Sequence, residues 1–263
     1  MRFRLLFASL LTSLLISGAA PRDVAAWPAP LGDWSEIALR LSESDRLLEA
    51  GLSKEALIER LVQVQAAPAL SAGASPPLPE TFVADVKAAL LAYPRCFLSF
   101  LLKNNVKILI APFVTAADAS LNNLHPRGYK DGLTFAECRA VFVPKSGNVI
   151  VASHYFRDGK LLENKYPTFG VQHELCHAVD FYLGRPSLTV AFRARYRQDK
   201  ELVSVVDNTY LRYYLQEGEG GPIETFGQLL VYKYTHVRER RTLALVRCFP
   251  DCVQQIDRFF PAN

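Results

Sequence analysis

One eight-residue segment constrains this chain more than any other feature: residues 173–180 read His-Glu-Leu-Cys-His-Ala-Val-Asp. In an α-helix, residues four positions apart lie one above the other on the same face. His173 and His177 can therefore direct two imidazoles at one Zn²⁺ ion. Glu174 is rotated by about 100° from His173, so its carboxylate misses the metal but can reach a water molecule beside it and act as a general base. The segment predicts a zinc site with hydrolytic equipment.

The flanking residues favour a single helix around this motif. Pro167 cannot continue a helix from upstream, and Thr168 is expected to be the N-cap. Gly184, followed by Pro186, indicates the end of the helix. Asp180 lies one turn after His177, where it could either orient an imidazole or cap a neighbouring loop. The ordinary alternative is an amphipathic helix with two incidental histidines.

A catalytic zinc site needs a third protein ligand and one open position. No histidine follows the motif closely, and His236 lies in a basic run. An acidic ligand on a later helix is the better candidate. Glu224 falls in the first turn of a helix that opens with Gly220-Gly221-Pro222, where an acid also stabilises the helix dipole. Glu219 remains an alternative ligand.

The two motifs together resemble a known family. Residues 173–184 (HELCHAVDFYLG) and 224–230 (ETFGQLL) are similar to the gluzincin-type zinc metallopeptidases that include the catalytic domain of anthrax lethal factor and the secreted Pro-Pro endopeptidases. The resemblance covers roughly residues 80–235. It implies that His173, His177 and Glu224 are the Zn²⁺ ligands, that Glu174 is the catalytic base, and that the substrate is a peptide or protein, with proline beside the cleaved bond.

The resemblance also implies a tyrosine that stabilises the oxyanion. Three tyrosines are candidates, and Tyr214 is favoured over Tyr210 and Tyr213 because it is nearest to Glu224 in the sequence. Two residues depart from the family pattern. Cys176 replaces a glycine and would place a thiol near the metal site, and Gln228 replaces a second glutamate. These departures motivate a second interpretation, a non-catalytic zincin-fold factor that binds a metal or a protein.

Residues 1–20 are typical of a secretory signal peptide, with Arg2 and Arg4 before the apolar run 5–16 and small residues after it. The run is too short for a comfortable transmembrane helix, so we expect a secreted or periplasmic protein without a stable membrane anchor. Without those two arginines, 28 basic residues face 26 acidic ones. This near-neutral balance argues against a nucleic-acid partner. The oligomeric state is not predicted.

Export permits disulfide bonds. One of the five cysteines, Cys176, lies on the motif helix. The other four allow three pairings, and we favour Cys248–Cys252 together with Cys96–Cys138. Buried free thiols are the alternative.

The remaining sequence predicts an α+β, zincin-like domain in which a small mixed sheet precedes the active-site and ligand helices. Residues 28–66 read as an N-terminal helical segment, with helices near 34–41 and 54–64 and Ser53 as an N-cap. Residues 67–79 read as an Ala/Ser/Pro-rich linker, and the N-terminal region could also be a pro-segment. Residues 80–263 form the predicted catalytic domain, with a helix over 82–102 and strands near 106–113, 133–143 and 147–156. We expect residues 148–155 to form a sheet edge that binds peptide.

Overall fold

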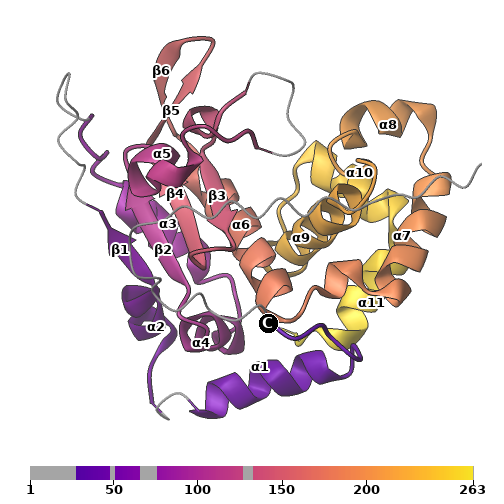
Figure 1. Cartoon of the computed structure of the whole chain (residues 1–263). Coiled ribbons are helices and arrows are strands. Elements are labelled where there is room, and N and C mark those ends of the chain that lie inside the picture. Colours follow the sequence, from indigo (N-terminus) through magenta and orange to yellow (C-terminus); the bar gives the residue numbers. More distant parts are fainter. Residues whose placement is uncertain (1–27, 48–50, 66–75, 127–132, 263) are drawn as a thin grey trace, which may run out of the picture.

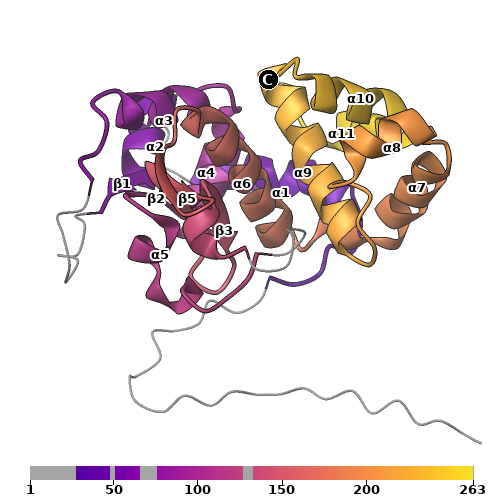
Figure 2. The same cartoon turned by 90° about the horizontal axis from the view of Figure 1, so that it is seen from above.

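The chain folds into a half built on a β-sheet and a half built from helices. Between them, helices α6 (Pro167–Tyr182) and α9 (Gly220–Thr235) pack against each other (Figures 1 and 2). This computed structural model describes residues 28–47, 51–65, 76–126 and 133–262. The predicted signal peptide lies outside the described residues, as does most of the predicted linker. One continuous apolar core runs through both halves.

The main sheet has four strands in the order β1 (Val62–Val64), β2 (Lys107–Ala111), β4 (Asn148–Ala152) and β3 (Ala140–Val143). Strands β1, β2 and β4 are parallel, and β3 runs antiparallel to β4. Strands β5 (His154–Arg157) and β6 (Lys160–Glu163) form a separate antiparallel hairpin. The sheet is therefore small and mixed, and it precedes the two central helices, so the predicted α+β class is confirmed.

The two faces of the sheet bury different residues because side chains alternate along a strand. Ile108 and Val149 join the main core, which α6 shares, whereas Leu109 and Ile150 belong to a smaller cluster that includes Val114 of α5 (Val114–Ala117). Helix α6 thus lies against one face of β3 and β4. The motif helix is held rigidly by the sheet.

Helices α3 (Phe82–Leu90) and α4 (Arg95–Lys103) replace the single helix predicted over 82–102. Pro94 causes the break, because it has no N–H to donate and disfavours a helical residue before it. Pro94 instead serves as the N-cap position of α4, with extended backbone angles. Helix α3 packs on α6.

Helix α2 (Lys54–Leu61) begins as predicted, since the Ser53 hydroxyl accepts a hydrogen bond from the Ala56 N–H at 3.2 Å. It ends three residues earlier than predicted. Val62–Val64 contains two β-branched valines, which favour strands, and forms β1 alongside β2. The sheet therefore includes residues on both sides of the predicted linker.

The N-terminal segment contacts both halves. Helix α1 (Glu36–Leu47, indigo in Figure 1) packs on α4. Just before it, the Trp34 ring is buried among aromatic rings of the helical half, with centroids 5.7 Å from those of Phe192 and Phe259. The Trp34 indole N–H donates to the Thr189 hydroxyl at 2.8 Å. Residues 34–47 thus connect the sheet half to the helical half.

The helical half also contains α7 (Val190–Glu201), α8 (Val205–Leu211), α10 (Arg240–Cys248) and α11 (Pro250–Phe259). Three 3₁₀ helices complete the described structure: Ala119–Leu121, Phe135–Glu137 and Pro186–Leu188. Among the described residues, no helix is both long enough and apolar enough to cross a membrane.

All five cysteines are free thiols, so both predicted disulfides are wrong. Cys138 belongs to the smaller cluster and Cys96 packs against the main core, on opposite sides of the sheet. Cys252 is fully buried, while the partly exposed Cys248 lies beside Asp207. The break between α10 and α11 at Phe249 separates their environments.

Candidate metal centre

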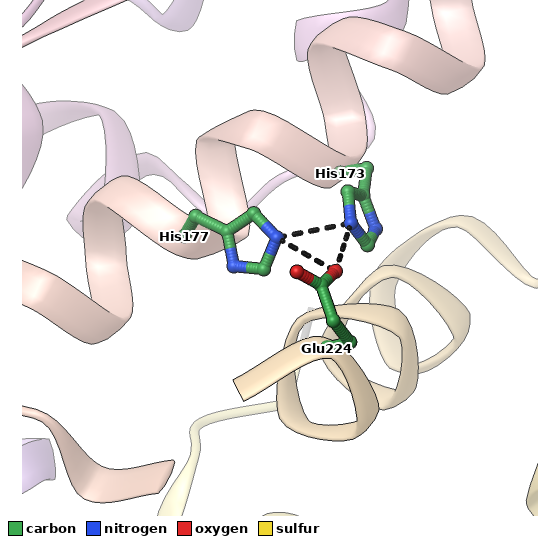
Figure 3. Close-up of side chains that lie close together, drawn as sticks. All are labelled: His173, His177 and Glu224. Atoms are coloured by element: carbon green, nitrogen blue, oxygen red, sulfur yellow. Dashed lines mark hydrogen bonds and ion pairs between the residues drawn. The ribbon is translucent and has the colours of Figure 1, made fainter. Parts of the chain in front are cut away.

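Three side chains from two helices converge between the halves of the molecule (Figure 3). The Nε2 atoms of His173 and His177 lie 3.0 Å apart, and they are 3.0 and 3.2 Å from one oxygen of Glu224. The nearest ligand atoms of all three residues lie within 4.8 Å of one another. Among the described residues, no other group of three His, Cys, Asp or Glu side chains meets this criterion.

Local sequence explains why the two histidines share one face. Helix α6 begins with Pro167 in its first turn and Tyr166 in the N-cap position. The prediction that Thr168 is the N-cap is therefore wrong. The helix ends at Tyr182, two residues before Gly184, the predicted stop signal, whose φ of +85° suits glycine. His173 and His177 lie one turn apart within this uninterrupted helix.

Helix α9 brings Glu224 to the histidines by a close approach at Gly227. A Cβ atom at this position would lie 3.1 Å from Cε1 of His177, tighter than ordinary contacts. Gly227 follows Glu224 by three residues and shares its face of the helix. A glycine here lets the backbone of α9 approach the imidazole that Glu224 must reach.

These residues fit a zinc ion by their donor chemistry. Two imidazole nitrogens and a carboxylate oxygen face one point, and all three are electron-pair donors when neither Nε2 carries a proton, so a cation among them offsets their repulsion. His173 and Glu224 are 8% and 6% exposed, so water compensates little of this repulsion. Two histidines and one carboxylate are a ligand set that catalytic zinc sites use, with a fourth position open.

The pKa values of these groups in the metal-free protein show how strongly the histidines and Glu224 interact. Burial disfavours a charged His177, but the Glu224 carboxylate outweighs burial and raises the pKa of His177 to about 9. Burial likewise opposes a charged Glu224, yet the two imidazoles hold the pKa of this carboxyl far below its ordinary value. In the absence of metal, a proton takes the place of the cation.

Of the two roles predicted for Asp180, it caps the neighbouring loop. Its carboxylate accepts hydrogen bonds from the N–H and the hydroxyl of Ser187, at 2.9 and 2.7 Å, and so caps the loop after α6. It does not orient an imidazole. The Nδ1 atoms of His173 and His177 are buried without a hydrogen-bond partner among the described residues.

Glu174 lies beside the three converging groups without joining them. One of its oxygens accepts a hydrogen bond from the backbone N–H of Phe142 on β3, at 2.8 Å. This contact fixes the carboxylate at the wall of a cleft. Sequence reasoning missed the role of Phe142, because a backbone donor on a distant strand leaves no signal in the side-chain pattern.

The cleft consists of two cavities, of about 680 and 710 Å³, that share Glu174 and several other lining residues. Both are lined by Ala140, Glu174 and Tyr213. We call the first the arginine arm, because Arg139, Arg157 and Arg241 line it. We call the second the apolar arm, since its wall is largely apolar; this wall includes Leu124, Phe135, Val141, Phe142, Leu188 and Ile223.

The three candidate tyrosines have distinct surroundings. Tyr214 is 3% exposed, and its hydroxyl donates to Gln228 at 3.3 Å. The Gln228 amide in turn donates to the Thr242 hydroxyl at 3.0 Å, so the oxygen and the nitrogen of this amide are both hydrogen-bonded. Tyr213 lines both arms, and Tyr214 only the arginine arm. The Tyr210 ring lies beneath Arg240, outside both arms.

Other sequence-based candidates lie away from the three ligand atoms. Glu219 is exposed at the N-cap position of α9 and is not part of the cluster. Cys176 is fully buried against Tyr93, with 3.5 Å between the sulfur and the hydroxyl oxygen. Burial raises the pKa of this thiol to about 12. The Cys176 thiol is therefore part of the core and does not join the three ligand groups.

The predicted peptide-binding edge is also wrong, because β4 lies inside the sheet between β2 and β3. The strand at the cleft is β3. Its Phe142 N–H faces Glu174, and the alternation of an antiparallel ladder turns the backbone groups of Ala140 the same way. The His154 ring is hydrogen-bonded to the Ser153 hydroxyl at 3.0 Å and lies outside the metal cluster.

The structure is similar to that of the Pro-Pro endopeptidase PPEP-2 from Paenibacillus alvei, with a TM-score of 0.52 and 22% sequence identity. The match covers 78% of this chain and 100% of that one. No protein-family model matches the sequence, and no curated protein matches it. The similarity shows that the chain has a zincin-like fold.

Proposed function

We propose that this protein is a zinc-dependent endopeptidase. The convergence of His173, His177 and Glu224, with Glu174 beside them, carries the proposal. The cleft supports an endopeptidase over an exopeptidase, since it continues on both sides of Glu174 and has room for peptide in each direction. The similarity to PPEP-2 supports peptides with proline at the cleaved bond as the first substrates to test.

His173, His177 and Glu224 would hold the zinc, which as a Lewis acid polarises a carbonyl and lowers the pKa of water. Glu174 accepts a proton from the attacking water and returns it to the leaving amine. The Phe142 N–H holds one Glu174 oxygen, so the other is the better placed for this transfer. No step requires Cys176 or Gln228, the two residues that depart from the family pattern.

Tyr213 is the better placed oxyanion donor, although Tyr214 is nearer to Glu224 in sequence. Tyr213 lines the cleft on both sides of Glu174, whereas the buried Tyr214 hydroxyl is directed at Gln228. A phenol at a developing negative charge is a suitable donor. We therefore expect Tyr213→Phe to lower the rate of cleavage by about 10²-fold or more, and Tyr214→Phe to lower it less.

The peptide would bind along β3. An extended chain can add a strand to a free sheet edge through main-chain hydrogen bonds. Ala140 lies on this edge and lines both arms of the cleft. A peptide paired there would run past Glu174 and the metal ligands. A crystal complex with the peptide elsewhere would contradict this placement.

The decisive experiment combines zinc stoichiometry with cleavage of a proline-rich peptide library, for the wild type and Glu174→Gln. We expect one zinc per chain in both proteins and a rate about 10²–10⁴-fold lower in the variant. Zinc retained by a wild type that cleaves nothing would favour the alternative, a non-catalytic factor that binds a metal or a protein.

We also propose export to the periplasm or the medium, on the basis of residues 1–20. Cell fractionation of the full-length chain, with N-terminal sequencing of the exported product, tests this. A product that stays in the cytoplasm with residues 1–20 attached would contradict it. The free cysteines set no requirement for an oxidising compartment.

A further inference from the structure

The two arms of the cleft differ in their positive charges. Arg139, Arg157 and Arg241 line the arginine arm and come from three separate parts of the chain. The apolar arm has one arginine, Arg185, whose guanidinium lies 3.8 Å from the Asp180 carboxylate. Within the described part of the chain, none of the first three makes an ion pair within 4.0 Å. Among the described residues, the arginine arm is therefore the arm whose guanidinium groups have no carboxylate partner.

Arg139 is held in place by an aromatic platform. Its guanidinium carbon lies 4.5 Å from the centre of the Tyr155 ring, and its Nη2 donates to the Tyr155 hydroxyl at 2.6 Å. Tyr155 is only 7% exposed, so the platform itself is fixed. A guanidinium fixed in this way loses less conformational entropy when it binds a planar anion. Arg157 follows Tyr155 by two residues on β5, which places both side chains on one face of the hairpin.

Arg241 occupies an electrostatically unfavourable position. It lies in the first turn of α10, which contains no acidic residue, and the positive end of the helix dipole disfavours a cation there. An anion bound in the arm would offset both charges.

Besides Glu174, two glutamates line this arm, and neither forms an ion pair with the three arginines. The Glu137 carboxylate accepts a hydrogen bond from the Thr134 N–H at 2.8 Å, within a capping box. Glu239 is exposed at the N-cap position of α10. Apart from the proposed base Glu174, this arm therefore has three guanidinium groups and two carboxylates, both of which are engaged or exposed elsewhere.

We propose that the arginine arm binds a carboxylate of the substrate, with Arg139 as its principal donor. This inference rests on the proposed peptidase function and names a substrate class: peptides with an acidic group a few residues from the cleaved bond. Guanidinium groups bind carboxylates through two parallel hydrogen bonds. The carboxylate would be an Asp or Glu side chain, or the free C-terminus of a short substrate.

Binding without turnover provides the test. The zinc-loaded Glu174→Gln protein is titrated with fluorescein-labelled Ala/Pro decapeptides that carry one Glu at each position in turn. A matched series has Gln instead, and every peptide is made with a free and an amidated C-terminus. We expect the carboxylate to strengthen binding by about 10–100-fold at one or two positions, the range of a charge-assisted hydrogen bond. The Glu series reports a side chain, and the free C-terminus reports the terminal carboxylate.

Adding Arg139→Gln should abolish this preference and leave the affinity for the Gln and amide peptides within about twofold. Arg241→Gln keeps the contacts between Arg139 and Tyr155 and should weaken the preference only in part. Arg197→Gln removes an exposed arginine on α7 and serves as the matched control, which should retain the preference. Equal affinity in all wild-type series, or a preference that survives in the triple variant of Arg139, Arg157 and Arg241, would overturn the proposal.

Cleavage by the wild type separates this proposal from the peptidase proposal. A carboxylate preference in binding with no cleavage of any peptide would overturn only the catalytic function. Cleavage of neutral and acidic peptides at equal kcat/KM, with equal affinities, would overturn only the carboxylate site.

Discussion

The two faces of helix α6 differ in what their side chains contact. On the core face, Leu175 is fully enclosed, and near the end of the helix the buried Asp180 carboxylate accepts hydrogen bonds from the N–H and the hydroxyl of Ser187. On the cleft face, His173 and His177 point their Nε2 atoms at each other and at a carboxylate. These three groups can each donate an electron pair to one cation, so their convergence marks the cleft face as the one that binds a ligand.

The largest effect should come from a metal ligand. Glu224→Ala removes one of three donors and should weaken zinc binding by more than the 10–100-fold typical of losing a supporting partner. Glu219→Ala is the matched control, since this exposed acid is five residues earlier. Isothermal titration with a competing chelator measures both affinities. Equal losses in the two variants would place the third ligand elsewhere.

A core residue beside the motif should affect stability instead. Leu175 is 0% exposed, and Leu175→Ala should lower the free energy of unfolding by about 2–5 kcal/mol, because it leaves a cavity. Urea unfolding of the metal-free protein gives this value. At low temperature the folded variant should still bind zinc with wild-type stoichiometry. Loss of zinc from a folded variant would contradict the separation of the two faces.

The cleft face should respond to pH in two opposite ways. With a pKa of about 9 in the metal-free protein, His177 must release a proton when zinc binds. Zinc affinity should therefore rise about tenfold per pH unit between pH 6 and 8. The ion pair with Glu224 stabilises the metal-free fold fully below pH 6.5, and this contribution is lost as the pH rises through about 9.

Chelator-competition titrations and thermal unfolding of the metal-free protein, each across this pH range, measure these two trends. A zinc affinity that does not change with pH would show that His177 is neutral before the metal binds.

The smallest effect should come from the cap that Asp180 forms on the loop after α6. Asp180→Ala leaves the buried Ser187 N–H unpaired and should lower the free energy of unfolding by about 1–3 kcal/mol. Zinc affinity should stay within about threefold, because Asp180 bonds the loop and not an imidazole. Thermal unfolding and zinc titration report the two quantities. A tenfold loss of affinity with little change in stability would show that Asp180 acts on the metal site.

Much of the metal centre could be predicted because it follows from local geometry. Helical periodicity alone puts His173 and His177 on one face, and the Gly-Gly-Pro start of α9 marks the helix that carries Glu224. The choice among the tyrosines could not be made in this way. It depends on Gln228 and Thr242, which lie far along the chain and bind the Tyr214 hydroxyl into a buried network.

The sheet shows the same limit. The apolar sequence of β4 is compatible with an edge or a central strand, and only its pairing with β2 and β3 decides the matter. Val62–Val64 reads as the end of a helix until β2 offers it a partner. The arginine arm could not be predicted either, since Arg139, Arg157 and Arg241 follow no regular spacing in the sequence.

The position of Trp34 has a consequence for how the chain reaches its native state. Its ring meets those of Phe259 and Phe260, more than 200 residues away. Contacts between such distant positions raise the contact order, and folding slows as contact order grows. The helical half cannot complete its packing until the first and last described helices have both been synthesised. We therefore expect a newly made chain to stay incompletely folded until α11 has been synthesised.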